Sequence, residues 1–192
     1  MTNPGPNGKT PQTVKKIATA LQRVGWAGFW LQLILAVVSS LIFLFAIPFA
    51  STGASNPGTG GSLLFAVGGL LILYGSTFWS FRYVTISRKL KNPDLRPKKA
   101  ETIKTIQWGI ISSLAGLGFS VMGAESIAGT LLGKSLSSAT PFAAFSPDAL
   151  SKIIQPLDIF IVLANTHLIT AHFIGILGSL FLFSQISKSG GS

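Results

Sequence analysis

The sequence predicts an all-α polytopic membrane protein with four transmembrane helices and with both chain ends on the cytoplasmic side. Three observations support this fold class. Charged residues make up only 10% of the 192 residues and hydrophobic residues 48%, whereas a soluble domain carries about 25% charged residues. The apolar residues form four runs, and each run is long enough to cross a bilayer, which takes about 20 residues. Most basic residues lie before the first run or between the second and third runs, as expected for segments on the cytoplasmic side.

The four runs define a membrane domain over residues 24–186. Each run is bounded by proline, glycine or charged residues, which end apolar helices. The third and fourth runs are long enough to tilt or to extend beyond the hydrocarbon core. The predicted spans are about 24–47, 62–83, 106–133 and 157–186, followed by a C-terminal tail over residues 187–192.

The first 23 residues are expected to be a disordered N-terminus followed by a basic amphipathic segment. Residues 1–8 are rich in proline, glycine and asparagine, a composition typical of disorder. Thr10 and Pro11 then resemble a helix N-cap and a first helical residue. Two interpretations stay open, namely a helix lying along the inner membrane surface and a cytoplasmic extension of the first span.

The distribution of charge and tryptophan sets the orientation. Twelve of the fifteen Lys and Arg residues lie in the N-terminal arm or around the connection between the second and third runs. The positive-inside rule therefore places both segments in the cytoplasm, and four spans return the C-terminus to that side. The tryptophans fall at the same predicted inner interface, where indole rings prefer to lie; they are Trp26, Trp30, Trp79 and Trp108.

The connections that precede and follow the third run contain residues that predict local structure. The middle connection, KNPDLRPKKAETIK, contains two prolines and is expected to bend, with residues 98–104 starting the third helix early. In the outer connection, FSPDALSKII offers Ser146 as a cap, Pro147 for a first turn and Asp148 near the positive end of a helix dipole. An interfacial helix is the first interpretation of this segment, and a re-entrant segment is the alternative.

The residue inventory argues against several function classes. Cysteine is absent, so disulfides, thiolate ligands and a cysteine nucleophile are excluded. No HExxH, GxSxG or Walker-type motif occurs in a suitable setting, and the sequence predicts neither an enzyme nor a cofactor. The basic clusters flank membrane spans and are expected to face anionic lipid headgroups rather than nucleic acid.

The fourth run contains a stripe of polar residues. Four of them recur at intervals of seven: Asp158, Asn165, His172 and Ser179. Residues at this interval drift by only about 20° per step on a helix. Because polar groups are costly in lipid, the stripe is expected to face protein or water. It is interpreted either as a packing seam, with hydrogen bonds to neighbouring helices, or as part of a path for ions or protons.

The third run contains a carboxylate and a ridge of small residues. Glu125 lies well inside the run, and an ionisable residue at membrane depth is a functional-site hypothesis by default. A protonated Glu125 that donates a hydrogen bond is the alternative. Small residues at intervals of four predict close helix packing. The residues assigned to packing are Gly116, Ser120, Gly129 and Gly133, in a ridge that also holds Ser112, Ala124 and Ala128.

The polar residues of the two runs suggest a cation route. If the third and fourth helices are neighbours, Glu125 and Asn165 lie at similar depth in the outer half of the membrane, and His172 lies deeper. Carboxylate and imidazole suit Fe, Mn or Zn, and a proton relay would need the same residue types. The predicted path or cation-binding residues are Glu125, Asp158, Asn165 and His172, with Glu125, Asp158 and His172 as metal ligands.

The segments FWSFRYVTISRKL, GLGFSVMG and LDIFIVLAN, followed by AHFIG, resemble a known family. The chain resembles the chloroplast inner-envelope "permease in chloroplasts" family, also described as a component of the inner-envelope import translocon, with cyanobacterial relatives. The resemblance covers about residues 20–186. The positions that match are Trp79, Phe81, Asp158, His172 and Phe173.

The resemblance implies four membrane helices and two competing functions. The first hypothesis is a metal-cation permease, for iron, acting as a homo-oligomer or with a partner in the complex. The second is a non-transporting scaffold, assembly or protein-translocation subunit of a larger membrane complex. The family implies an amide at Glu125 in plant members, which weakens a carboxylate-dependent mechanism there. Because no long transit peptide is present, a cyanobacterial plasma or thylakoid membrane is expected.

Overall fold

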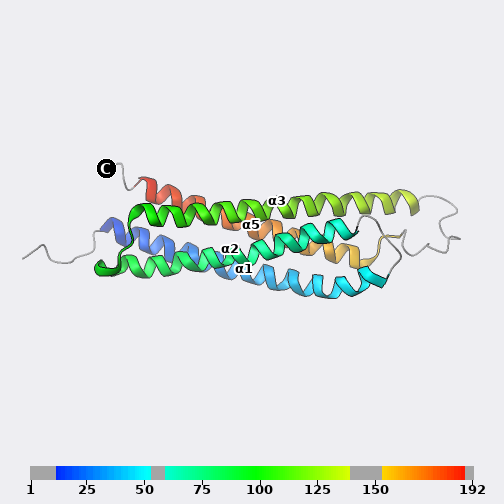
Figure 1. Ribbon diagram of the computed structural model, residues 1–192, viewed down its shortest axis with the longest axis horizontal. Helices are drawn as coiled ribbons and strands as arrows, with labels where there is room; N and C mark the ends of the chain where they lie inside the picture. Colours follow the sequence, from blue (N-terminus) through cyan, green and yellow to red (C-terminus); the bar gives the residue numbers. More distant parts are fainter. Residues whose placement is uncertain (1–11, 53–58, 139–152, 189–192) are drawn as a thin grey trace, which may run out of the picture.

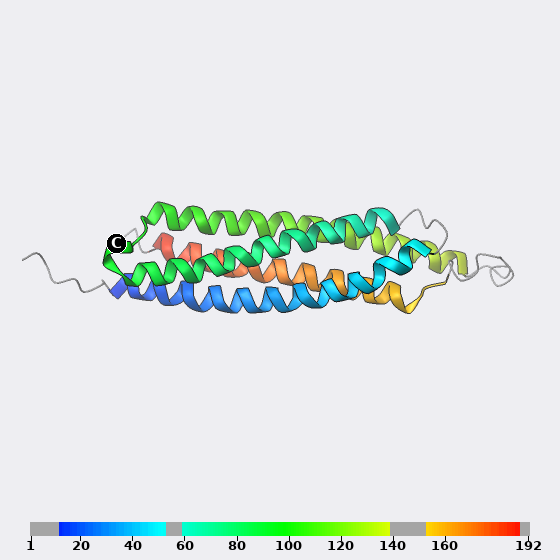
Figure 2. The same ribbon diagram turned by 60° about the horizontal axis from the view of Figure 1, so that its bottom comes forward.

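The computed structural model describes residues 12–52, 59–138 and 153–188. In these residues four long helices lie side by side as one elongated bundle (Figures 1 and 2). All four are long and apolar enough to cross a membrane, which confirms the predicted all-α membrane fold. The elements are α1 (Gln12–Thr52), α2 (Thr59–Lys91), the short 3-10 helix η1 (Pro93–Leu95), α3 (Lys99–Ser138) and α5 (Pro156–Lys188).

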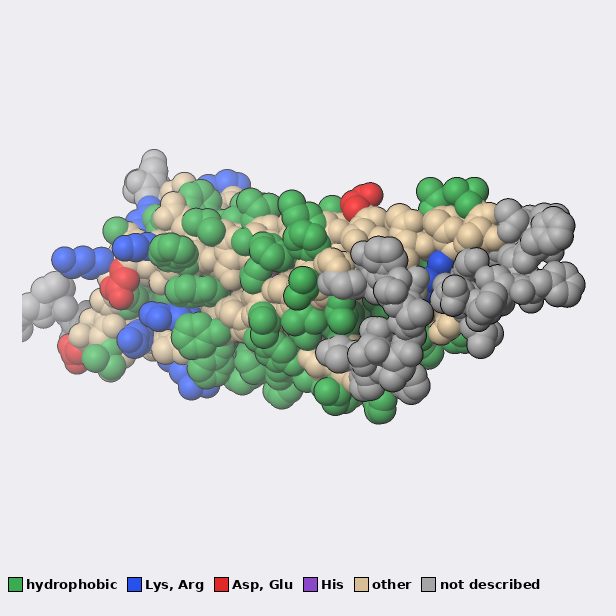
Figure 3. Space-filling view, turned by 45° about the vertical axis from the view of Figure 1, so that its right-hand side comes forward, with side chains coloured by type: hydrophobic (Ala, Val, Ile, Leu, Met, Phe, Trp, Pro, Cys, Tyr) green, Lys and Arg blue, Asp and Glu red, His purple; other side chains and the backbone are tan. Residues whose placement is uncertain are grey.

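The helices occupy the four corners of the bundle in an up-and-down arrangement. Both α1 and α3 pack against α2 and against α5, so α1 and α3 lie on opposite corners. The start of α1, the end of α5 and the connection from α2 to α3 all lie at one end (Figure 1). Lys and Arg side chains gather at this end, and hydrophobic side chains cover the middle of the bundle (Figure 3). The positive-inside rule assigns this basic end to the cytoplasm.

Helix α1 is much longer than a membrane is thick. Its 41 residues correspond to about 60 Å, roughly twice the hydrocarbon core. Residues 12–23 are the first turns of this continuous helix, and Ala18 and Leu21 are fully buried in the bundle. This segment is therefore continuous with the first span and packs within the bundle. Thr10 and Pro11 lie outside the described residues.

The connection between α2 and α3 bends as its prolines predict. The Asn92 side chain accepts a hydrogen bond from the backbone N–H of Asp94 at 3.2 Å, which caps η1. Helix α3 then begins at Lys99, so the predicted early start of the third helix is confirmed. The predicted interfacial segment FSPDALSKII falls mainly on residues 145–152, which lie outside the described residues.

Buried positions on α1 repeat every seven residues. Ala18, Gly25, Gln32 and Ser39 are all buried, and this interval is the signature of helices that pack at shallow crossing angles. Near the cytoplasmic end, Leu21 packs with Ile106 and Leu182. Towards the other end, a second apolar cluster joins α1, α2 and α5; it contains Ala36, Phe43, Ala66, Leu70, Leu73, Ala164, Leu168 and Ala171.

Aromatic side chains lie about three to five helical turns from the basic end, as expected for an interfacial belt. Trp26 stacks on Trp30 with ring centroids 6.2 Å apart. Phe29 reaches across to Phe81 of α2 at 5.8 Å. The guanidinium of Arg82 lies 5.6 Å from the centroid of the Trp79 ring, a cation–π geometry. The belt and the basic residues thus mark the same membrane surface.

The orientation is testable because the chain contains no cysteine. With Asp94→Cys, we expect a membrane-impermeant maleimide to label the protein only from the cytoplasmic side, since this residue lies in the basic connection. With Gly61→Cys, at the start of α2, we expect labelling only from the opposite side. The measurement is mass-shift labelling of right-side-out and inverted vesicles, and the reverse pattern would refute the assigned orientation.

Candidate functional site

The polar stripe of α5 faces the inside of the bundle. His172 has no exposed surface, and Asn165 and Ser179 are 2% and 3% exposed. Asp158, in the first turn of α5, has a mostly buried side chain. The prediction that the stripe faces protein rather than lipid is therefore confirmed, and it follows from the cost of leaving polar groups unbonded in a bilayer.

Each buried member of the stripe forms a hydrogen bond to another helix. The Asn165 Nδ2 group donates to the Ser120 carbonyl of α3 at 2.9 Å. The His172 Nε2 atom lies 3.1 Å from the Gly69 carbonyl of α2, so this nitrogen carries the proton and donates. The Ser179 hydroxyl pairs with the Tyr83 hydroxyl of α2 at 2.9 Å. These three contacts are the interhelical bonds expected of a packing seam.

Glycine makes room for the imidazole. A Cβ atom added at Gly116 of α3 would overlap the His172 ring. The backbone of α3 can approach the ring only because this position has no side chain. Ser120, one turn later, is also buried and donates from its hydroxyl to the Gly116 carbonyl at 2.9 Å. Gly116 and Ser120, two of the residues predicted to mediate packing, thus lie inside the bundle.

A second polar network, which the sequence interpretation missed, surrounds Gln32 of α1. The Gln32 Nε2 group donates to the Ser76 hydroxyl and to the Ala171 carbonyl, both at 3.2 Å. Its Oε1 atom accepts from the Ser80 hydroxyl at 2.9 Å, and Ser76 pairs with Ser113 of α3 at 2.6 Å. Gln32 therefore joins all four long helices at one level.

The sequence does contain a signal for this network. Ser76, Ser80, Tyr83 and Ser87 of α2 recur at intervals of four, three and four, which places them on one helix face. All four are buried, and Ser87 donates to the Ala18 carbonyl of α1 at 2.7 Å. Because serine is common in membrane helices, only the spacing distinguishes this face from an accidental scatter of hydroxyl groups.

The contacts between α1 and α5 repeat with the same interval. Gln32 bonds to the Ala171 carbonyl, and Ser39 donates to the Ala164 carbonyl at 3.0 Å. Both partners advance by seven residues, in opposite chain directions. Together with the bonds of Asn165 and His172, these contacts form what we call the axial seam, a line of buried polar groups along the bundle.

Two acceptor atoms of the axial seam have no hydrogen-bond partner among the described residues. They are the Asn165 Oδ1 and His172 Nδ1 atoms, which are inaccessible to solvent. A buried unsatisfied acceptor costs about 1–3 kcal/mol. The lone pairs of these atoms are therefore the groups of the seam that are available to a proton or a cation.

An ion pair closes the non-cytoplasmic end of the bundle. The Lys134 ammonium of α3 contacts both carboxylate oxygens of Asp158, at 2.9 and 2.7 Å. The Asp158 Oδ2 atom also accepts from the Gln155 backbone N–H at 2.8 Å. The side chains of Lys134 and Asp158 are only 8% and 14% exposed. Asp158 is thus neutralised by a neighbouring helix, a pairing that the sequence interpretation did not anticipate.

Glu125 faces away from the axial seam. It is exposed on α3, and no described residue forms a hydrogen bond or an ion pair with its carboxylate. Asn165 lies beside Gly123, so Asn165 and Glu125 are at similar depth although their side chains do not meet. Gly129 and Gly133, also predicted to mediate packing, are exposed, and a Cβ atom at either would meet nothing within 4 Å.

The structure brings some of the predicted site residues together and separates others. Asn165 and His172 share the axial seam, Asp158 lies at its end in an ion pair, and Glu125 lies outside it. Within the described residues, no group of three His, Asp, Glu or Cys side chains is arranged to hold a metal ion. The metal-ligand role of Glu125, Asp158 and His172 stays a prediction.

Comparisons with known proteins place these features in a family context. Residues 11–187 match the family described as "Protein of unknown function (DUF3611)". The chain is 30% identical, over 179 residues, to "Protein TIC 21, chloroplastic" of Arabidopsis thaliana. This alignment covers 91% of the chain and 59% of the relative, so the chain spans less than two thirds of the relative's length. No solved structure matches the chain.

The contact between Gly116 and His172 can be tested by adding one methyl group. We expect Gly116→Ala to lower the free energy of unfolding by about 1–3 kcal/mol, because overpacking a tight helix contact has this cost. Gly118→Ala is the matched control, since a Cβ atom there meets nothing within 4 Å. Thermal unfolding in detergent, followed by tryptophan fluorescence, compares the two. Equal stability of both variants would contradict the packing described for His172.

Proposed function

The chain belongs to the DUF3611 family, and from this premise we propose that it is a non-enzymatic assembly subunit of a larger membrane complex. In this proposal the bundle is a rigid scaffold, and α3 binds a transmembrane helix of another protein. One observation carries the proposal: an unpaired carboxylate, Glu125, lies on an apolar helix face that the rest of the described chain leaves uncovered.

The axial seam supports a structural role. Gln32, Asn165 and His172 are between 0% and 2% exposed, and each bonds to a neighbouring helix. A helical bundle in lipid gains little from apolar burial between its helices and depends on close packing and interhelical hydrogen bonds. The buried polar residues therefore have a sufficient role in holding the four helices in one arrangement.

The exposed surface of α3 has the spacing of a helix-packing face. Ile111, Met122 and Leu132 are between 54% and 61% exposed. Residues on this face alternate at intervals of four and three, which matches a contact with a second helix. We call it the α3 lipid face; it comprises Ile111, Ala115, Gly118, Met122, Glu125, Gly129, Leu132 and Leu136. Its two glycines would let another backbone approach closely.

Glu125 identifies the kind of partner that suits this face. An ionisable side chain inside a membrane costs roughly 2.5–3.5 kcal/mol when it faces lipid alone, so a donor from another helix would stabilise it. A second copy of the chain is the weaker candidate, because it would present the same carboxylate, and Lys134 is already paired with Asp158. We therefore propose a partner helix that carries Lys, Arg or a neutral hydrogen-bond donor opposite Glu125.

The family resemblance is compatible with this function. It implies either an import-translocon component or an iron permease, and the first of these is a subunit of a membrane complex. The relative named above is a chloroplast protein by its name. For this chain we propose a cyanobacterial plasma or thylakoid membrane as the location and a protein-translocation complex as one form of the assembly.

An iron permease is the second candidate function, and the unpaired acceptors of the axial seam favour it. The Asn165 Oδ1 and His172 Nδ1 atoms are buried lone pairs without a described partner, and such groups suit a passing cation or proton. This route would require the tightly packed helices to separate. The permease hypothesis therefore depends on a second conformation or on a partner, whereas the assembly hypothesis does not.

Ion flux separates the two candidates. We expect the purified chain in proteoliposomes to accumulate Fe²⁺ no faster than protein-free liposomes, because Gln32, Asn165 and His172 are buried and bonded to neighbouring helices. An ionophore added at the end confirms that the vesicles are intact. Uptake above the protein-free rate, abolished by His172→Ala and retained in Gly118→Ala, would favour the permease and count against the assembly proposal.

Crosslinking tests the α3 lipid face directly. With a photo-crosslinking amino acid at Met122, we expect an adduct with another membrane protein in native membranes, and about tenfold less adduct after Glu125→Ala, because the partner then loses a polar contact. Ile34 on α1 is the control, since its exposure of 54% is close to the 57% of Met122. Adducts only between two copies of the chain, or equal adducts at both positions, would contradict the proposal.

A further inference from the structure

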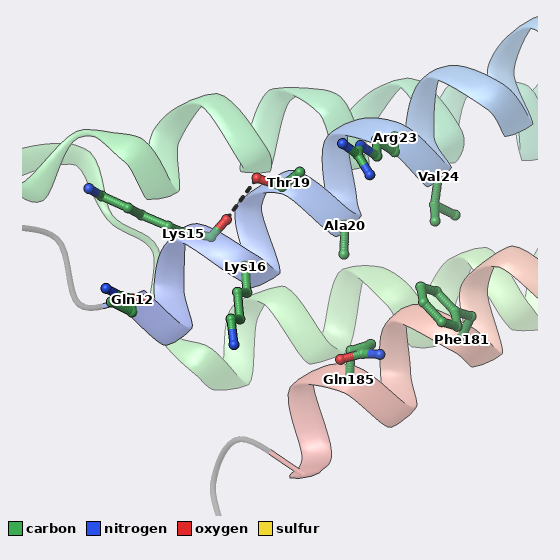
Figure 4. A pocket seen from close by; sticks show the side chains of 9 residues that line it. All are labelled: Gln12, Lys15, Lys16, Thr19, Ala20, Arg23, Val24, Phe181 and Gln185. Carbon is green, nitrogen blue, oxygen red and sulfur yellow. Dashed lines mark hydrogen bonds between the residues drawn. The ribbon is translucent and has the colours of Figure 1, made fainter.

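A groove lies between α1 and α5 at the basic end of the bundle. It has a volume of about 570 Å³ and is formed by the first turns of α1 and the last turns of α5. Figure 4 shows Lys16, Ala20 and Val24 on the α1 side and Phe181 and Gln185 on the α5 side. Its lining residues are Gln12, Lys15, Lys16, Thr19, Ala20, Arg23, Val24, Phe181 and Gln185.

The groove has a strongly positive rim. Lys15, Lys16 and Arg23 line it, and no acidic residue does. The described first turn of α1 also contains no acidic residue that would offset the positive potential of a helix N-terminus. No described residue forms an ion pair or a hydrogen bond with the side-chain nitrogens of these three cations. The rim is therefore suited to an anion.

The other part of the groove is apolar and points towards the bilayer. Ala20, Val24 and Phe181 line it, and Phe181 is 50% exposed. Trp26, at the start of the aromatic belt, follows Val24 by two residues. The cations thus lie at headgroup level, and the apolar wall lies at the level where acyl chains begin.

We propose that this groove binds one anionic phospholipid. Lys16 and Arg23 contact the phosphate, Lys15 adds to the positive field, and the Gln185 amide donates to an ester carbonyl. The first segment of an acyl chain lies along Val24 and Phe181. A free phosphate in the cytoplasm would suit the same cations, but it would leave the apolar wall without a role, so the joint presence of both surfaces favours a lipid.

The selectivity of the site follows from its charges. A zwitterionic headgroup such as phosphatidylcholine places a quaternary ammonium beside the phosphate, and the three cations of the rim repel it. Each basic residue near a membrane surface contributes about fivefold to the binding of an anionic lipid. Loss of two of the three cations is therefore expected to weaken phosphatidylglycerol binding by about 25-fold.

Native mass spectrometry of the full chain in detergent tests this site. The chain is titrated with phosphatidylglycerol or phosphatidylcholine, and bound lipid is counted from the mass. We expect one phosphatidylglycerol to remain bound, phosphatidylcholine to dissociate, and Lys16→Gln/Arg23→Gln to raise the Kd for phosphatidylglycerol by about 25-fold. Arg88→Gln/Lys89→Gln is the matched control, because both residues are exposed on α2 at the same end and outside the groove.

Three outcomes would overturn the lipid site. Equal retention of both lipids would remove the charge argument. An equal loss in the Arg88/Lys89 control would show a general effect of net charge rather than a groove. Displacement of phosphatidylglycerol by millimolar inorganic phosphate would identify a site for a soluble anion. Thermal unfolding of each variant, without added lipid, confirms that a loss of binding does not reflect a loss of fold.

Discussion

The bond from His172 to the Gly69 carbonyl, in the space left by Gly116, shows the constraint on which the rest of the bundle depends. In lipid, a buried polar group has no water to bond with and must find its partner on another helix. That requirement brings helices close together, and closeness requires small residues at the crossing points. The axial seam, the glycines and the seven-residue spacing of the buried faces are three consequences of this one requirement.

Much of the fold is predictable from the sequence because lipid imposes simple rules. Apolar length predicts the four spans, basic residues predict their direction, and the interval of seven predicts that Asn165 and His172 face inwards. The outward direction of Glu125 is not predictable in this way, since the free-energy cost of a carboxylate in lipid predicts that its side chain is buried. The Gln32 network was missed because a single amide has no period of its own. Its serine partners on α2 become recognisable only when their shared face is considered.

The candidate site is less predictable than the fold because the role of each residue in it depends on contacts with distant parts of the chain. Asp158 reads as a free carboxylate in the sequence, but Lys134 neutralises it from α3. Gly116 and Gly129 belong to similar small-residue patterns, yet a Cβ atom at Gly116 would overlap the His172 ring and one at Gly129 would meet nothing within 4 Å. Pairing between helices decides each of these roles, and local sequence does not encode it. The polar interior is therefore explained by packing within the bundle, whereas we assign the exposed Glu125 carboxylate to contact with a partner helix.

The repeated contacts between α1 and α5 have a consequence for how the helices find their alignment. Sliding one helix past the other by a heptad, about 10 Å, would bring Gln32 from the Ala171 carbonyl to the Ala164 carbonyl with unchanged chemistry. The repeat alone thus permits a shifted, mispaired state during insertion. An ion pair that occurs once removes this degeneracy, because Lys134 and Asp158 meet in only one alignment. This ion pair therefore selects one alignment among several that the seven-residue repeat would otherwise permit.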